Sequence, residues 1–189
     1  MSSSVNRLIN RPILATIHTD AFRHNLGRIR ELAPESKIWS VVKAKAYGHT
    51  LEAAFKGLES TDGFALLDIA DAQWLRDHGW QGRILLLEGL FNQQELELAV
   101  KLKCDLVIHS EKQVAWLEAF ANHLSSPTNL FLKLNSGMNR LGFRSEQYRT
   151  AFHRLHAAGY RLHHMTHFAN ADQVDQAPSV RSEERRVGK

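Results

Sequence analysis

Short apolar segments alternate with segments of helical periodicity along most of the chain, and this alternation constrains the fold more than any other feature. Strands are expected at residues 37–42, 63–67, 83–87, 105–108, 129–134 and 160–167. They are mostly continuous apolar runs, which is typical of strands buried on both faces of a parallel sheet. The sequence therefore predicts an α/β protein, either doubly wound or a (β/α) barrel.

Helix signals separate these strands at intervals of about 20 to 30 residues. The expected first residues of the helices are Asp20, Thr50, Asp68, Ser110 and Ser145. Ser110 and Gln113 have the spacing of a capping box, and Gly159 suits the end of the last helix. A closed barrel of this type has eight strands. The expected fold is therefore an incomplete barrel with about six of eight βα units.

Composition excludes several functional classes. The net charge of +4 is not arranged as a basic stripe interleaved with aromatic residues, which argues against nucleic-acid binding. No uncharged apolar run approaches the roughly 18 residues of a membrane span, and the first residues lack a signal-peptide core. Cys104 is the single cysteine, so no internal disulfide can form. We expect a cytoplasmic protein that binds neither membrane nor nucleic acid.

Basic side chains occur at three of the expected strand ends. Lys43 follows the first strand, Lys133 lies in the fifth, and His167 ends the sixth. In α/β proteins the carboxyl ends of strands line the site. Alternation along the fifth strand points the leucines at 130, 132 and 134 to the helices, and Phe131, Lys133 and Asn135 inward. A lone buried cation is costly, so Lys133 must be paired, neutralised or modified, and Arg140 has the wrong sign to pair with it.

Other chemistries lack suitable residues. His163 and His167 share a strand face but lie about 13 Å apart, and His164 points the other way, which disfavours a metal site. Neither a nucleophile elbow nor a glycine-rich phosphate loop is present. A lysine whose amine is activated by desolvation remains, of the kind that forms imines. Tyr47 and His49 follow Lys43 closely enough to contact a phosphate group.

Five stretches together resemble the bacterial alanine racemases, which are fold-type III pyridoxal-phosphate enzymes. They are Val-Val-Lys-Ala-Lys-Ala-Tyr-Gly-His at 41–49, Asp-Gly-Phe-Ala at 62–65, Leu-Leu-Leu-Glu-Gly at 85–89, the segment 132–143 and the segment 166–172. The resemblance runs from about residue 11 to residue 172 and corresponds to the N-terminal barrel portion of the family. It implies a (β/α)8 barrel that lacks two strands and a C-terminal β domain.

The resemblance also implies roles for individual residues. Lys43 would bind pyridoxal 5'-phosphate covalently and act as the catalytic base for the D-enantiomer, while Tyr47 would hold the phosphate. Lys133 matches a lysine that is N-carboxylated (carbamylated) in many members. Its carbamate would pair with Arg140, which would reach both the phenolic oxygen of the cofactor and the carboxylate of the substrate.

Two further residues complete the implied site. Met138 would lie beside the substrate entrance, and His167 would contact the pyridine ring. Lys45 departs from the family pattern, where asparagine or aspartate is usual, and lies either near the cofactor or in solvent. Asn135 and Ser136 replace a common Asp-Thr pair.

The implied activity is interconversion of L-alanine and D-alanine, which supplies D-alanine for peptidoglycan, in a homodimer whose partner subunit provides a second base. A broad-specificity amino-acid racemase of the same fold and a non-catalytic pyridoxal-phosphate carrier remain as alternatives. The segment 12–17 would pair with the C-terminal domain in the family, so here we expect it to lack a partner. We expect residues 11–180 to form the partial barrel, residues 181–189 to be a non-native tail, and the chain alone to be inactive and poorly folded.

Overall fold

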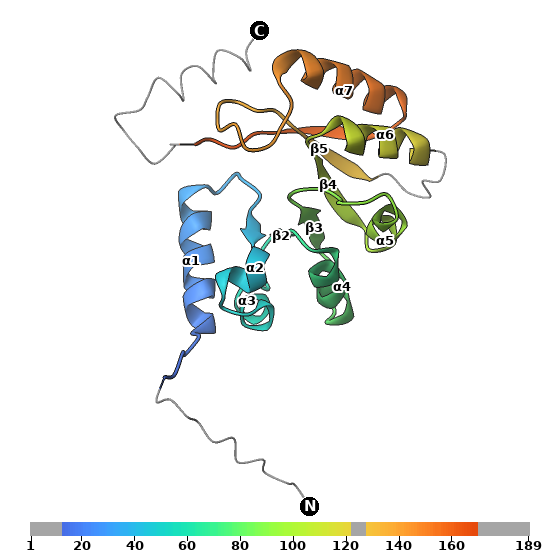
Figure 1. Ribbon diagram of the computed structural model, residues 1–189. Helices are drawn as coiled ribbons and strands as arrows, with labels where there is room; N and C mark the ends of the chain where they lie inside the picture. The colour runs from blue at the N-terminus through green and yellow to red at the C-terminus, as the bar shows by residue number, and fades with distance from the viewer. Residues whose placement is uncertain (1–12, 122–127, 170–189) are drawn as a thin grey trace, which may run out of the picture.

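The chain forms a parallel sheet whose strands follow one another in space in the same order as in the sequence, as the computed structural model in Figure 1 shows. The structure describes residues 13–121 and 128–169. The strands are β1 (Trp39–Val41), β2 (Gly63–Leu66), β3 (Arg83–Leu86), β4 (Cys104–Ile108), β5 (Asn129–Lys133) and β6 (Arg161–Met165). The helices are α1 (Thr19–Leu32), α2 (Lys43–Tyr47), α3 (Leu51–Gly57), α4 (Ile69–Asp77), α5 (Glu95–Lys101), α6 (Glu111–Phe120) and α7 (Ser145–Ala157).

The two faces of the sheet differ in what covers them. Leu66, Leu86, Leu106 and Leu130 are register partners on consecutive strands, and each is 1% exposed or less. They belong to one apolar cluster that also contains the buried helix residues Ala72, Leu75, Leu96, Leu117 and Leu155. Burial of each such leucine side chain contributes about 1.5–3 kcal/mol. The helices therefore pack on the leucine face of the sheet.

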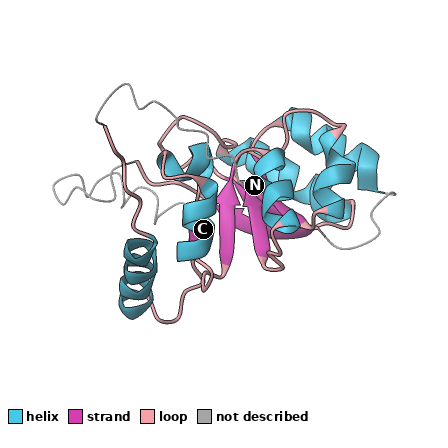
Figure 2. Cartoon of the chain, turned by 90° about the horizontal axis from the view of Figure 1, so that it is seen from below, coloured by secondary structure: helices cyan, strands magenta, loops and turns pink. Residues whose placement is uncertain are grey.

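The opposite face carries a smaller cluster of Ala65, Leu85 and Val107, with Phe131 and Met165 against it. A doubly wound sheet has helices on both faces and a strand order that reverses, whereas a barrel has sequential strands with its helices outside. The observed order and the one-sided helix layer confirm the barrel alternative. Figure 2 shows the strands adjacent to one another with helices packed along them.

The sheet is an open portion of a barrel. Within residues 13–121 and 128–169, β1 pairs only with β2, and β6 pairs only with β5. A groove of about 370 Å³ lies between α1 and β1 and is lined partly by Leu26 and Ile29 of α1, Val41 of β1 and Tyr47. Six parallel strands with two free edges agree with the expected six of eight βα units.

The helix starts agree only in part with the expectations. Thr50 Oγ1 accepts a hydrogen bond from the Ala53 N–H at 3.2 Å, and Ser110 Oγ accepts one from the Gln113 N–H at 3.5 Å. The reciprocal half of the expected capping box is wrong, because Gln113 Oε1 accepts from the His109 N–H instead, at 3.0 Å. The side chain of Gln113 is drawn away from Ser110 by the turn that follows β3, to which its amide also donates.

Helix α5 was not expected from the sequence. Its start is fixed by a reciprocal pair in which the Glu95 N–H donates to Asn92 Oδ1 at 3.1 Å and Asn92 Nδ2 donates to Glu95 Oε1 at 2.9 Å. Only Leu96 and Ala99 of this short helix are buried. The apolar periodicity is therefore too sparse to identify the helix, whereas the Asn92–Glu95 spacing was an available signal.

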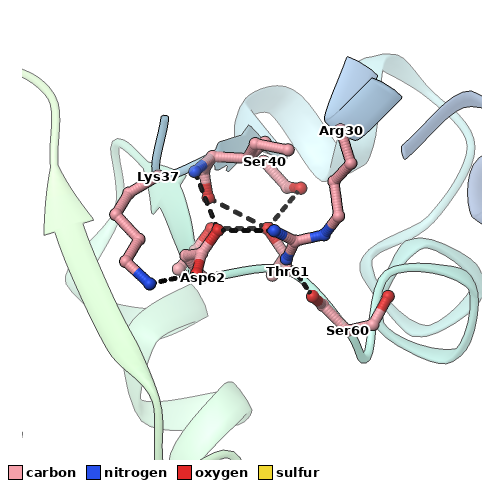
Figure 3. Close-up of polar contacts among 8 residues, drawn as sticks. Arg30, Lys37, Ser40, Ser60, Thr61 and Asp62 are labelled. Carbon is pink, nitrogen blue, oxygen red and sulfur yellow. Dashed lines mark hydrogen bonds and ion pairs between the residues drawn. The ribbon is translucent and has the colours of Figure 1, made fainter. Parts of the chain in front are cut away.

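A polar cluster joins the carboxyl end of α1 to the first strands (Figure 3). Asp62 Oδ2 accepts from the Ile38 N–H at 2.9 Å, and Arg30 and Lys37 form ion pairs with the same carboxylate at 3.2 and 3.4 Å. The Ile38 N–H holds the pKa of Asp62 below its usual value, and Lys37 and Arg30 act in the same direction against the effect of partial burial. Thr61 Oγ1, 2.8 Å from Ser40 Oγ, ties the same two strands together.

Gly63 in the same segment lies directly under an aromatic ring. A Cβ atom at Gly63 would lie 2.4 Å from Trp39 Cζ3. The Asp-Gly pair at 62–63 thus carries out two local tasks, because the aspartate anchors β1 through its backbone and the glycine leaves room for Trp39.

Three sequence expectations concern the chain ends. Residues 13–17 form no strand, and Ile13 and Leu14 are 74% and 88% exposed, because no neighbouring strand within the described part of the chain pairs with them. Pro12, the part of the last motif at 170–172 and the expected tail 181–189 lie outside the described residues. No helix in residues 13–121 and 128–169 is long and apolar enough to cross a membrane.

Candidate active site

Lys43 follows β1 after one further residue, the buried Val42. Val42 is 1% exposed, and its N–H donates to the Ala65 carbonyl at 2.8 Å, which continues the pairing with β2 for one residue past the strand. The chain then turns, so Lys43 stands at the carboxyl edge of the sheet and is half-buried. This is the position that the sequence predicted for it.

The turn after Lys43 is left-handed, which the sequence did not predict. Ala44, Lys45, Ala46 and Tyr47 have φ values of 51°, 53°, 54° and 55°. Non-glycine residues adopt this region at a cost of roughly 1–2 kcal/mol each. Backbone hydrogen bonds hold the turn, including the Ala46 N–H to Val42 O at 2.9 Å and the Gly48 N–H to Ala44 O at 3.2 Å. Strained backbone of this kind concentrates at functional sites.

The left-handed turn sets the directions of the side chains around Lys43. The Nζ atom of Lys43 lies 5.9 Å from the centroid of the Tyr47 ring, so the tyrosine predicted to hold a phosphate stands beside the predicted cofactor lysine. His49 is turned back instead, with Nδ1 2.8 Å from the Ala46 carbonyl. Lys45 is exposed, and its charge acts on Asp71 at the start of α4. Of the two positions left open for Lys45, the structure favours solvent.

Lys133 is the last residue of β5 and only 7% exposed. Leu130 and Leu132 are fully buried in the helix-facing cluster while Phe131 packs in the other cluster, which confirms the predicted alternation along this strand. Burial lowers the pKa of the Lys133 amine, the charge of Arg140 lowers it further, Glu88 opposes the shift, and Lys43 adds to it. The conflict between burial and charge at Lys133 is therefore present in the structure.

The loop after β5 folds back onto the end of that strand. The Phe143 N–H donates to Lys133 O, and the Asn135 N–H donates to Phe143 O, both at 2.9 Å. Gly142 has a φ of +117°, and a Cβ there would lie 2.7 Å from the Asn135 nitrogen, so the close return of the chain requires glycine. This return keeps Arg140 near the strand end that carries Lys133.

Asn135 has a different structural role from the predicted one, which was to point inward from the fifth strand. Its Oδ1 atom accepts from the backbone N–H groups of Gly137 and Asn139, both at 3.1 Å, so it organises the loop and does not point into the barrel. The expectation for Asn135 was wrong because β5 ends at Lys133 and the alternation ends with it. Ser136 is hydrogen-bonded to Thr166, which in turn donates to the Leu134 carbonyl at 3.2 Å and ties the loop to the end of β6.

His167 lies just beyond β6 and shares the surroundings of the two lysines. Partial burial lowers the pKa of its imidazole, and the charges of Arg140, Lys133 and Lys43 lower it further, in that order. The site therefore gathers four basic side chains from the ends of β1, β5 and β6. Met138 is half-buried in the loop between Asn135 and Arg140.

The histidines of β6 divide between its faces as predicted. His163 stacks on Phe131 with ring centroids 5.0 Å apart, on the inner side of the sheet. His164 stacks on Phe152 of α7 at 5.9 Å, on the helix side. The two rings therefore cannot share a ligand, and His163 lies in the barrel interior away from the strand ends.

Glu88 is a site residue to which sequence reasoning gave no role. It lies in the turn after β3, and its charge acts on Lys133 against the effect of Arg140. The motif Leu-Leu-Leu-Glu-Gly at 85–89 was recognised as part of the resemblance. The signal that could have identified Glu88 was its position after a strand end. Lys43, Lys133 and His167 were identified by that rule, because the carboxyl ends of strands line the site.

The residues at this edge fit a phosphate-bearing aldehyde such as pyridoxal 5'-phosphate. Lys43 supplies an amine at the sheet edge, and Arg140, Lys133 and His167 repel one another electrostatically. Glu88 is the one acidic group that acts on Lys133 within the described part of the chain. Anionic phosphate and carboxylate groups would reduce this repulsion, since opposite charges favour the charged form of each basic group.

The fold and the site together define a (β/α)-barrel protein with a lysine-centred cationic site at the carboxyl ends of its strands. Comparison with protein families and known proteins gives the particular family. Residues 17–187 match the family described as alanine racemase, N-terminal domain. The chain belongs to this family.

The relatives agree in sequence and in structure. The chain is 51% identical over 164 residues to the alanine racemase of Paracidovorax citrulli and 48% identical over 172 residues to that of Delftia acidovorans. These matches cover 86% and 90% of the chain but 44% and 46% of the relatives. The solved biosynthetic alanine racemase of Pseudomonas aeruginosa is 38% identical with a TM-score of 0.85, over 93% of this chain and 49% of that one. The chain thus spans less than half the length of the curated relatives it matches.

Proposed function

We propose that this chain forms the N-terminal barrel portion of an alanine racemase that interconverts L-alanine and D-alanine with pyridoxal 5'-phosphate, for the D-alanine of peptidoglycan. The observation that carries the proposal is Lys43, held at the carboxyl end of β1 among Lys133, Arg140 and His167. Relatives about 50% identical bear the name alanine racemase, which supports the substrate.

Lys43 is proposed to bind the cofactor covalently and to exchange a proton with the substrate. When bound, pyridoxal phosphate acts as an electron sink for the carbanion at the α-carbon of an amino acid. The task of the protein is to fix orientation and to move the proton. Lys43 Nζ is the proposed acceptor of the α-proton on one face of that carbon, and the left-handed turn keeps its side chain aimed at the site.

Tyr47 and His167 are proposed to hold opposite parts of the cofactor, the phosphate and the pyridine ring. Tyr47 stands beside Lys43 and is 60% exposed, so we expect its hydroxyl to be accessible to a ligand. Partial burial, and then the neighbouring positive charges, lower the pKa of His167, which favours a neutral imidazole against an aromatic ring. Met138 is proposed to contact the substrate at the entrance.

Lys133 is proposed to be carboxylated, with its carbamate paired to Arg140. Burial and the charge of Arg140 already lower the pKa of the Lys133 amine, which favours the free amine that reacts with CO₂. A carbamate would replace the repulsion between the two side chains by an ion pair. Arg140 would then be positioned for the carboxylate of the substrate.

Racemisation requires a second base on the other face of the carbanion, and we propose that it comes from the partner subunit of a homodimer. The free edges of β1 and β6 are proposed to pair with the remaining strands of a complete barrel, of which the groove beside β1 would receive one. On this view residues 11–180 form the partial barrel, and the chain alone does not racemise alanine.

The test locates the cofactor lysine in a complete racemase that contains this chain. Reduction with borohydride should fix the cofactor on Lys43, as mapped by mass spectrometry. Lys43→Ala should abolish both the adduct and racemisation. Lys45→Ala is the matched control, since Lys45 is exposed two residues away and should leave both unchanged.

Three outcomes would contradict parts of this proposal. An adduct on Lys45 would overturn the assignment of Lys43. An adduct without turnover would favour a pyridoxal-phosphate carrier. Equal turnover of several amino acids would favour a broad-specificity racemase.

A further inference from the structure

The left-handed turn after Lys43 is closed by a histidine that lies two residues beyond it. The carbonyl of Ala46 lies 2.8 Å from His49 Nδ1 and also accepts from the His49 N–H at 3.1 Å. A carbonyl oxygen can only accept, so Nδ1 carries the proton and donates. One residue therefore holds this carbonyl twice, once through its backbone and once through its imidazole.

A second contact fixes the orientation of the His49 ring. The ring centroids of His49 and Phe22 lie 5.6 Å apart at an interplanar angle of 85°, which is the edge-to-face arrangement that aromatic side chains favour. Phe22 belongs to α1 and packs against the main apolar cluster. The imidazole therefore connects the turn to the helix beside it.

Ala46 links this contact to Lys43. Ala46 is only 4% exposed, and its N–H donates to the carbonyl of Val42, the residue before Lys43, at 2.9 Å. The four residues 44–47 have positive φ, which is unfavourable for residues other than glycine. The turn therefore depends on its hydrogen bonds. Within the described part of the chain, the His49 imidazole supplies the one side-chain hydrogen bond to residues 44–48.

We propose that His49 is a positioning residue for Lys43: its imidazole keeps the left-handed turn closed, and the closed turn keeps the Lys43 amine at the sheet edge beside Tyr47. The inference rests on the proposed function, in which Lys43 binds pyridoxal 5'-phosphate. It gives His49 a role through the turn, in place of the phosphate contact that its position in the sequence suggested.

The size of the effect follows from the loss of one hydrogen bond. Such a loss changes an equilibrium about threefold to tenfold. In His49→Ala the turn should therefore open about threefold to tenfold more often, and Lys43 should keep its orientation for less of the time. His49 is exposed, so its truncation leaves no buried cavity that would destabilise the whole fold.

Two substitutions distinguish the two nitrogen atoms of the imidazole. Asparagine carries its N–H two bonds from Cβ, as Nδ1 does, so His49→Asn keeps a donor for the Ala46 carbonyl. Glutamine carries its N–H one bond farther out, near the place of Nε2, so His49→Gln loses this donor but keeps one that can reach a phosphate. His24→Ala is the matched control, because His24 is an exposed histidine on α1 without a recorded contact in the described part of the chain.

The first measurements use a complete racemase that contains this chain, freed of its cofactor. Hydrogen exchange of a peptide spanning 42–50 reports on the turn. The rate at which succinimidyl acetate labels Lys43, mapped by mass spectrometry, reports on the accessibility of the amine. In His49→Ala and His49→Gln the peptide should exchange about threefold to tenfold faster, and Lys43 should be labelled faster. His49→Asn and His24→Ala should follow the unmodified protein.

A second measurement connects the turn to the reaction. With the cofactor restored, kcat is divided by the amount of cofactor that borohydride fixes on Lys43, and the KM for alanine is measured beside it. His49→Ala and His49→Gln should lower this kcat while KM stays unchanged, and His49→Asn should restore it. Because kcat refers only to protein that holds the cofactor, a loss of folded protein does not lower it.

Three results would overturn the proposal. The first is unchanged exchange in His49→Ala. The second is faster exchange with an unchanged kcat per fixed cofactor, which would confine His49 to stability. The third is rescue by His49→Gln and not by His49→Asn, which would indicate a direct phosphate contact through Nε2. Exchange and labelling require neither cofactor nor turnover, so a failure here leaves the racemase proposal to the Lys43 test.

Discussion

Replacement of Ala44 by glycine should stabilise the protein, although the same exchange destabilises most helices. Ala44 has φ 51° and ψ 48° and an exposed side chain, so the substitution removes no packing. A non-glycine residue costs roughly 1–2 kcal/mol in this region. Glycine avoids that cost but adds about 0.5–1 kcal/mol of backbone entropy to the unfolded state. The net expectation is a gain of about 0.5–1 kcal/mol.

Ala115→Gly provides the matched control. Ala115 is exposed in the middle of α6, where the backbone is an ordinary right-handed helix, so glycine should cost about 0.5–1 kcal/mol there. For a domain of this size 1 kcal/mol corresponds to a shift in melting temperature of about 2–4 °C. Circular dichroism should therefore show Ala44→Gly melting a few degrees above, and Ala115→Gly a few degrees below, the unmodified complete racemase.

The opposite signs are what test the reasoning. If Ala44→Gly lowers the melting temperature as much as Ala115→Gly does, the turn is not left-handed in solution or its strain is absent. Hydrogen exchange of a peptide spanning 42–50 separates these explanations, because the amides of Ala46 and Gly48 are bonded within the turn. Protection of both amides together with a lowered melting temperature would leave the left-handed geometry standing and refute the energetic argument.

Two further predictions concern the Asp-Gly pair that positions β1. Asp62→Asn should cost about 0.5–1.5 kcal/mol at neutral pH, because the ion pairs with Arg30 and Lys37 are lost while an amide oxygen still accepts from Ile38. Since the pKa of Asp62 is lowered in the folded state, its contribution to stability is present above the unfolded pKa, near about 3.9, and disappears as the pH falls through the folded pKa. Urea unfolding of both proteins at several pH values measures this contribution. A difference in unfolding free energy that stays constant at all pH values would contradict it. Gly63→Ala should cost about 1–3 kcal/mol of stability, because the new Cβ would lie 2.4 Å from the Trp39 ring. An unchanged melting temperature together with an unchanged near-ultraviolet tryptophan signal would disprove this steric clash.

The sheet was predictable because its central strands, β2 to β4, are largely buried on both faces. Such strands appear as continuous apolar runs, and each of the six expected runs overlaps one strand, with β4 beginning one residue earlier than expected. The strand ends were predicted less accurately, since the run at 160–167 contains a strand only over Arg161–Met165. The residue at which a strand ends depends on how far it pairs with the neighbouring strand, and that partner is not visible in the local sequence. For the same reason the pairing order became clear only from the structure.

The site was predictable where it depends on alternation and strand ends. Lys43 and Lys133 were found in this way, and the structure places both at the carboxyl edge. The left-handed turn could not be predicted, because alanine, lysine and tyrosine have no preference for positive φ and only Gly48 is a signal. The charge of Glu88 acts on Lys133, two strands away. Such long-range effects are absent from any local pattern.

The free energy that keeps the basic side chains close together comes from apolar burial in another part of the fold. Lys133, Arg140 and His167 repel one another, so the site itself opposes folding in the absence of an anion. The leucine layer on the other face of the sheet, represented by Leu86 and Leu106, supplies the opposing apolar burial. Removal of one charge at the sheet edge therefore changes the chemistry without removing the packing that keeps the strand ends in place. This separation is the reason that Lys43→Ala and Lys45→Ala can report on function independently of stability.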